Sequence, residues 1–157
     1  MNVALLIPVL PLIGFLINGL FGKKLSKSLV GLIGSASILA AFVCVLITFA
    51  NFISGGMEVQ YVTAFEWFNI GDTTLAMSFQ IDQLSLIMMT LVTGVGFLIH
   101  LYSIGYMHDD ENYNRFFAYL NLFVFFMLLL VMGDNYVVMF TGWEGVGFCS
   151  YLLIGFW

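Results

Sequence analysis

The sequence predicts an all-α integral membrane protein of five transmembrane helices with one short hairpin outside the membrane. Only 8% of its 157 residues are charged and 62% are apolar, with a mean hydropathy of +1.06. A soluble domain carries roughly 25% charged residues, so this composition excludes an ordinary soluble enzyme. The net charge of −5 also argues against a nucleic-acid partner, because phosphate binding requires clustered Lys and Arg.

Five uncharged or nearly uncharged stretches are long enough to cross a bilayer. A hydrocarbon core of about 30 Å needs about 20 apolar residues in a helix, whose backbone groups are then hydrogen-bonded internally. The first stretch is not a cleavable signal peptide, because its basic residues follow it instead of preceding it. The predicted spans are Asn2–Gly22, Leu29–Ile53, Gln83–Met107, Phe116–Met132 and Tyr136–Trp157.

All 4 basic residues lie in segments that would be on one side of the membrane. Lys23, Lys24 and Lys27 lie between the first and second spans, and Arg115 lies between the third and fourth. Because short cytoplasmic loops are enriched in Lys and Arg, we expect these two loops to face the cytoplasm. The N-terminus is then extracytoplasmic.

The segment 54–82 is the one sizeable predicted region outside the membrane. Thr73–Ile81 alternates between apolar and polar residues, which is the period of a half-buried strand. Val59, Tyr61 and Thr63 form a weaker partner, and 69–72 carries a turn signal. We therefore expect a hairpin that lies on the membrane surface, and we divide the chain into 1–53, 54–82 and 83–157.

One acidic residue, Glu144, lies inside a predicted span, eight residues from its start, or about 12 Å along a helix. A charge at that depth costs about 2.5–3.5 kcal/mol and usually serves ion or proton transfer inside a bundle or beside a water file. One turn away, Thr141 can donate a hydrogen bond and Gly147 leaves room for water or another helix. We favour a proton-transfer acid over the alternative of a structural interhelical hydrogen bond.

His100 is a second candidate, because histidine exchanges protons near neutral pH. It lies seven residues before the end of the third predicted span, and its position favours an interfacial residue within an aromatic belt over a proton shuttle. No basic residue lies inside a span, so a partner for Glu144 must be His100, water or a group outside this chain. Cys44 and Cys149 show no disulfide or metal spacing and are interpreted as buried packing residues.

The residues from Gly142 to Trp157 closely resemble the fifth-helix signature of the largest antiporter-like subunits of respiratory complex I, the chain 5 family of NADH-quinone oxidoreductase. The resemblance is strongest from about residue 80. The other stretches that resemble the family are 82–85, 92–103, 105–107, 115–119 and 134–135.

This resemblance implies a proton channel module whose first part is 83–157, in a complex that couples NADH oxidation and quinone reduction to proton transport. The glutamate matching Glu144 pairs, in that family, with a lysine on a later helix. The resemblance implies no cofactor in this chain, with FMN, iron–sulfur clusters, NADH and quinone on other subunits. It implies as partners the other membrane-arm subunits, the lipid bilayer and a C-terminal part of the same subunit, since family members are several times longer. The expected location is a bacterial inner membrane or its organellar equivalent.

Two alternatives remain open from the sequence. Large subunits of multi-component Na⁺/H⁺ antiporters also carry a Trp-Glu pair on the matching helix, although the continuation from Gly145 to Tyr151 favours complex I. The other alternative is a structural membrane anchor without ion transport.

Overall fold

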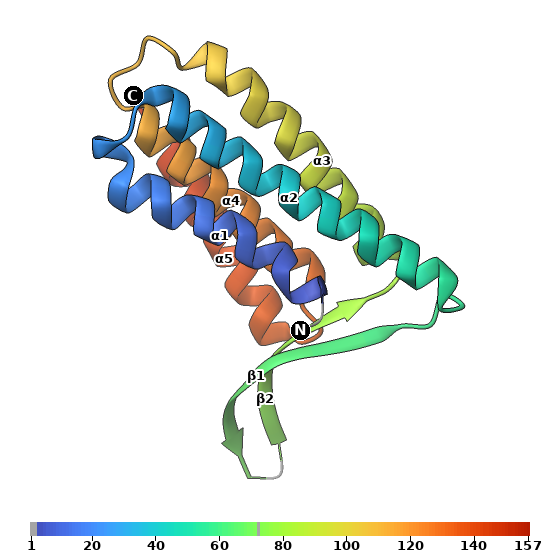
Figure 1. Cartoon of the computed structure of the whole chain (residues 1–157). Helices are drawn as coiled ribbons and strands as arrows, with labels where there is room; N and C mark the ends of the chain where they lie inside the picture. Colours follow the sequence, from blue (N-terminus) through green and yellow to red (C-terminus); the bar gives the residue numbers. More distant parts are fainter. Residues whose placement is uncertain (1–2, 72) are drawn as a thin grey trace.

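The computed structural model describes residues 3–71 and 73–157, so Asn2 of the first predicted span and Asp72 of the predicted turn lie outside it. In this part of the chain all five predicted spans are helices long and apolar enough to cross a membrane. They form an elongated bundle with a hairpin at one end (Figure 1). The helices are α1 Val3–Phe21, α2 Lys27–Ser54, α3 Gln83–Tyr106, α4 Tyr113–Met132 and α5 Tyr136–Ile154, with a short 3₁₀ helix η1 Gly22–Lys24 after α1.

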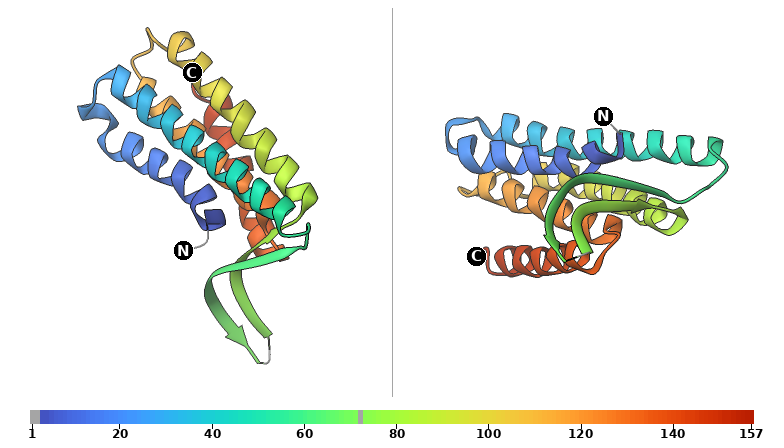
Figure 2. Two further views of the ribbon diagram at one scale, coloured as in Figure 1. Left: turned by 45° about the vertical axis from the view of Figure 1, so that its right-hand side comes forward. Right: turned by 90° about the horizontal axis from the view of Figure 1, so that it is seen from below.

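The first four helices pack on one another, whereas α5 lies on one side of the bundle. α1 packs on α2 and α4, and α3 packs on α2 and α4. The one helix against which α5 makes an extensive contact in the described chain is α4, and Figure 2 shows α5 as a separate outer layer. One face of α5 is therefore available to other molecules or segments.

The two ends of the bundle differ in charge. The end at which α1 and α3 finish and α2 and α4 begin carries the 4 basic residues, and we call it the basic end. There the Lys27 ammonium donates to the carbonyl oxygen of His108, over 2.8 Å. The opposite end carries the two strands and is called the hairpin end.

The predicted hairpin is present and is longer than its sequence pattern indicated. β1 Gln60–Ile70 pairs antiparallel with β2 Thr73–Ile81, whereas the pattern placed the first strand around 59–63. The half next to the helices contributes buried side chains of Val62, Phe79 and Ile81 to the bundle core.

The distal half of the hairpin extends beyond the helices and bends (Figure 1), and its expected position on the membrane surface stays a prediction. The pairing register shifts between Thr63 and Phe65 and again between Glu66 and Phe68. Such bulges bend a strand and increase its local twist. The bend thus has a local cause in β1 that alternation of residue types does not reveal.

α3 begins at a capping box. The Asp82 carboxylate accepts from the Ser85 backbone N–H (2.7 Å), and the Ser85 hydroxyl oxygen accepts from the Asp82 N–H (2.9 Å). The Gln80 amide donates to the other Asp82 oxygen over 3.0 Å. The backbone bond from Ser85 is the main cause that holds the pKa of Asp82 below its ordinary value, against an opposing effect of partial burial.

The start of α5 is bound to the hairpin. Asn135 caps the helix, because its side-chain oxygen accepts from the N–H groups of Val137 and Val138 at 3.2 and 3.0 Å. Its amide group donates to the Ala76 carbonyl oxygen of β2 over 3.0 Å. A second contact is the bridge between Gly133 and Phe79. The hairpin therefore fixes the turn from which α5 departs.

Two glycines bring the backbone of α5 close to α4. A Cβ on Gly142 would lie 2.7 Å from the Cα atom of Leu130, and a Cβ on Gly145 would overlap the ring of Phe126. Small residues allow such close helix contacts in membranes. Gly142 and Gly145 therefore lie on the face of α5 that packs against α4.

Replacing Asp82 with Ala should destabilise the subunit by about 1 kcal/mol, the usual cost of losing an N-cap, whereas Asp82→Asn keeps an acceptor and should cost less. Because the folded-state pKa is lowered, the stabilisation of the wild type is present above the unfolded-state pKa of about 3.9 and is lost as the pH falls through the folded value. Thermal unfolding of the subunit within its full-length protein measures both variants. Equal losses for Asn and Ala would contradict the capping role.

Replacing Gly142 with Ala should destabilise the α4–α5 contact by about 1–3 kcal/mol, the usual cost of overpacking. Gly105→Ala is a matched control, because a Cβ on Gly105 meets open space and Ala is the better helix former by roughly 0.5–1 kcal/mol. The midpoint of thermal unfolding should therefore fall for Gly142→Ala and rise for Gly105→Ala. An unchanged unfolding midpoint for Gly142→Ala would show that α4 and α5 can move apart at this contact without loss of stability.

Candidate functional site

The candidate proton-transfer acid, Glu144, lies near the middle of α5 and on its open face. It follows the helix start at Tyr136 by eight residues, about 12 Å along the axis. The buried residues of α5 are those that face α4, namely Val138, Gly142, Gly145 and Cys149. Glu144 is instead exposed, together with Phe140, Trp143, Gly147, Phe148 and Tyr151.

The five helices leave the side of Glu144 open, so the predicted setting of a bundle interior or a water file stays a prediction. Within residues 3–71 and 73–157, Glu144 has no hydrogen-bond or ion-pair partner, and the single ion pair joins His108 and Asp109. A carboxylate at mid-membrane depth is costly unless protein or water covers it. The five helices therefore supply the acid but not its surroundings.

The two residues next to Glu144 on its helix have different relations to it. The Thr141 hydroxyl donates to the Val137 carbonyl oxygen over 2.8 Å, so it is bonded within its own helix and not to Glu144. A Cβ on Gly147 would meet nothing within 4 Å, which leaves an open surface one turn from the acid. That open surface agrees with the room predicted at Gly147.

His100 lies inside the bundle and not in an interfacial aromatic belt. Its exposure is 0%, and its ring packs edge-on against Phe117, with 6.0 Å between centroids. The nearby Tyr102 and Tyr106 are exposed and stack on each other instead. Burial of His100 depends on α2 and α4, which is why the sequence alone suggested the interface.

The protonation pattern of His100 follows from one hydrogen bond. Its Nδ1 lies 2.7 Å from the Gly96 carbonyl oxygen, and since a carbonyl can only accept, Nδ1 carries the proton in the neutral ring. The other nitrogen, Nε2, is buried with no partner in the described chain. His100 and Glu144 are not brought together, because one faces the bundle core and the other faces away from α4.

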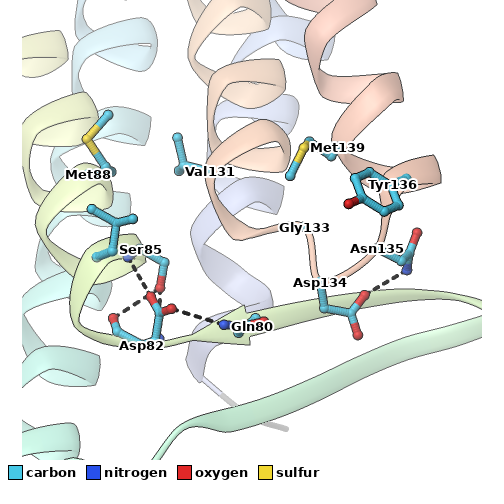
Figure 3. A pocket seen from close by; sticks show the side chains of 11 residues that line it. Gln80, Asp82, Ser85, Met88, Val131, Gly133, Asp134, Asn135, Tyr136 and Met139 are labelled. Carbon is cyan, nitrogen blue, oxygen red and sulfur yellow. Dashed lines mark hydrogen bonds between the residues drawn. The ribbon is translucent and has the colours of Figure 1, made fainter.

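A cavity at the hairpin end brings together two acidic residues, Asp82 and Asp134, that are far apart in the sequence. Its volume is about 530 Å³, and its lining includes Asp82, Ser85, Asp134, Tyr136 and Met139 (Figure 3). The Asp134 carboxylate accepts from the Asn135 amide over 2.7 Å. The pairing of Asp82 with Ser85 three residues later was a readable capping signal, but its meeting with the α4–α5 turn depends on the tertiary fold.

The two cysteines are free. Cys149 is buried against α4 as predicted, whereas Cys44 is only partly buried. Among the described residues no three His, Cys, Asp or Glu side chains form a group able to hold a metal ion.

Comparison with known proteins identifies the relatives of this chain. Residues 67–117 match a family model described as NADH-Ubiquinone oxidoreductase (complex I), chain 5 N-terminus. The NADH-quinone oxidoreductase subunit L of Escherichia coli K12 is 44% identical over 100% of this chain and 26% of its own length. The subunit L of Mycobacterium tuberculosis is 47% identical over 97% of this chain and 24% of its own. A fungal relative, the NADH-ubiquinone oxidoreductase chain 5 of Hypocrea jecorina, is 40% identical over 95% of this chain and 21% of its own.

The chain thus spans about a quarter of the length of the curated relatives it matches. The resemblance seen at the fifth helix extends over all five helices and the hairpin. Together with five apolar helices, these matches identify an integral membrane protein that is homologous throughout to the N-terminal part of the complex I chain 5 and subunit L family.

Proposed function

We propose that this chain is the N-terminal part of a proton-translocating membrane-arm subunit of NADH-quinone oxidoreductase. In this role it moves protons across the membrane, while NADH oxidation and quinone reduction take place on other subunits that hold FMN and the iron–sulfur clusters. The observation that carries the proposal is the position of Glu144, an acid halfway along a transmembrane helix on a face that the other four helices leave open.

A carboxyl group in that position can hold a proton and release it when its surroundings change. A nearby cation or a water file favours the ionised form, whereas apolar surroundings favour the neutral form. Open space at Gly147 gives room for such a partner one turn from the acid. We infer that the C-terminal remainder of the subunit covers this face and supplies a basic residue, as the family resemblance implies.

The hairpin-end cavity gives water a route to the first turn of α5. Tyr136 and Met139 of α5 line it together with the carboxylates of Asp82 and Asp134 (Figure 3). Met139 lies just over one helical turn before Glu144 along the chain. Proton exchange with the hairpin side therefore has only the second and third turns of α5 to cross.

His100 and Thr141 remain secondary candidates. His100 is enclosed by the bundle core and the Thr141 hydroxyl is bonded to its own helix. A direct step between either residue and Glu144 thus requires a side-chain rearrangement. Their roles in proton transfer stay predictions.

For the orientation, we propose that the basic end faces the cytoplasm and that the N-terminus and the hairpin are extracytoplasmic. The rule that Lys and Arg mark cytoplasmic loops supports it, since the 4 basic residues gather at one end. The membrane would be a bacterial inner membrane or an organellar equivalent. The remaining lipid-level faces of the bundle would contact other membrane-arm subunits and lipid.

Replacing Glu144 with Gln in the full-length subunit should slow proton transfer through it by about 100-fold or more, the contribution typical of a positioned acid–base group. Total pumping per electron in the assembled complex should fall by the share that this subunit carries. The measurement is proton-to-electron stoichiometry in reconstituted vesicles, with subunit content checked in parallel.

Glu66→Gln is the matched control, because Glu66 lies exposed in β1 of the hairpin and the chemical change is the same. It should leave pumping unchanged. Normal stoichiometry in an assembled Glu144→Gln complex would refute the proposed role. Loss of assembly in the Glu144 variant alone would favour a purely structural acid, and dependence of transport on Na⁺ would favour the antiporter alternative.

The orientation is tested by single cysteines at exposed positions. With Cys44 and Cys149 replaced by Ser, Glu58→Cys before the hairpin should react with a membrane-impermeant maleimide added to intact cells or organelles, because Glu58 is exposed at the hairpin end. Lys24→Cys at the basic end should react only after the membrane is opened. The reverse pattern would invert the topology.

A further inference from the structure

Three side-chain atoms in the described bundle are buried without a hydrogen-bond partner: Asn18 Oδ1, Ser35 Oγ and His100 Nε2. Leaving such a group unsatisfied costs about 1–3 kcal/mol, and buried polar atoms in native proteins are almost always bonded to protein or ordered water. All three lie in the half of the bundle nearer the basic end. This half of the bundle therefore contains buried hydrogen-bonding groups that its own side chains and backbone do not satisfy.

The contacts of two glycines show which levels of α2 and α3 lie beside each other, next to Tyr113 and Val124 of α4. A Cβ on Gly31 of α2 would lie 3.2 Å from Cγ1 of Ile104 on α3. A Cβ on Gly96 of α3 would lie 3.8 Å from Cγ2 of Ile38 on α2. The two helices run in opposite directions (Figure 1). One glycine contact therefore lies above, and the other below, a shared stretch of the α2–α3 interface.

Ser35 and His100 lie in the stretch of the α2–α3 interface between these two glycine contacts. Ser35 follows Gly31 by one turn along α2, and His100 precedes Ile104 by one turn along α3, so the two side chains face the same level of the interface. Their exposures are 4% and 0%, and no direct hydrogen bond joins them in the structure.

The Ser35 hydroxyl is buried without a bond, unlike most other Ser and Thr hydroxyls in these helices. Eight other Ser and Thr hydroxyls in these helices donate to a carbonyl oxygen three or four residues earlier, at 2.7–2.9 Å: Ser37, Thr48, Ser54, Thr90, Thr93, Ser103, Thr141 and Ser150. Ser35 makes no such bond. Its hydroxyl group is therefore free to bond a molecule held between α2 and α3.

We propose that Ser35 and His100 bind one buried water molecule between α2 and α3. With Nδ1–H bonded to Gly96, the imidazole can only accept at Nε2, so the water donates one hydrogen there. The Ser35 hydroxyl, which can donate or accept, supplies the second bond, and two partners are the minimum for a buried water. The site fixes His100 as the neutral Nδ1–H tautomer.

Asn18 is not part of this site. Its amide lies by Gly34, on the face of α2 where the Phe117 ring also packs, and it donates to the Val30 carbonyl oxygen over 3.2 Å. The ring of Phe117 also contacts His100. It therefore stands between the α1 side of the bundle and the water site.

The test is a high-resolution cryo-EM map of the intact complex in ordinary aqueous buffer. The expected result is a density peak within about 3.2 Å of both Ser35 Oγ and His100 Nε2. A direct bond between the two side chains, or an interface without a peak, would overturn the site. The wild-type map decides this question even if variants fail to assemble.

Variants then assign the peak to the named atoms. Ser35→Ala should abolish it, because the water loses one of two partners. Thr93→Val is the control, since Thr93 is equally buried in α3 but its hydroxyl is bonded to Met89, and the peak should remain. A peak that persists in Ser35→Ala would refute the role of Ser35. Because the proposal concerns water binding alone, it stands or falls independently of the pumping measurement at Glu144.

Discussion

The close backbone contact between α4 and α5 determines which way Glu144, the proposed proton-transfer acid, faces. Gly142 and Gly145 leave no space for side chains against Leu130 and Phe126, so rotating α5 about its axis would force larger residues into the seam. Glu144 lies two residues from Gly142, roughly 200° around the helix. The same contact that anchors α5 therefore turns the acid away from the bundle.

The other constraint on α5 comes from outside the predicted membrane region. Asn135 both caps α5 and bonds to β2, while the proximal half of the hairpin is packed into the core through Phe79 and Ile81. α5 nevertheless buries only 22% of its most apolar 18-residue stretch, against 33% to 44% for the corresponding stretches of the other helices. One end and one face are fixed, and the remaining surface requires partners that the first five helices do not supply.

The success and failure of sequence-based prediction here have the same physical origin. In lipid, a run of about 20 uncharged residues can only be a helix, so all five spans are predictable, and alternation around Phe79 suffices for β2. Which face of a helix is covered is a property of pairs of helices. The burial of His100 depends on Phe117 and α2, and the direction of Glu144 depends on α4. The bend of the hairpin likewise depends on bulges in β1, which follow from pairing register and not from residue type.

The structure distinguishes two kinds of polar residue within the transmembrane helices, which the sequence alone could not tell apart. His100 lies in the core, where Gly96, Phe117 and the proposed water satisfy it locally, so it adds cohesion without an outside partner. Glu144 has no local partner and lies on the opposite side of α4, on an open face. A proton path through the middle of the α1–α4 bundle would have to pass a core closed by Ile38, Leu128 and other fully buried side chains. A path along the outer face of α5 would need only a segment that covers Glu144, so we propose that the site is completed at an interface and not inside this bundle.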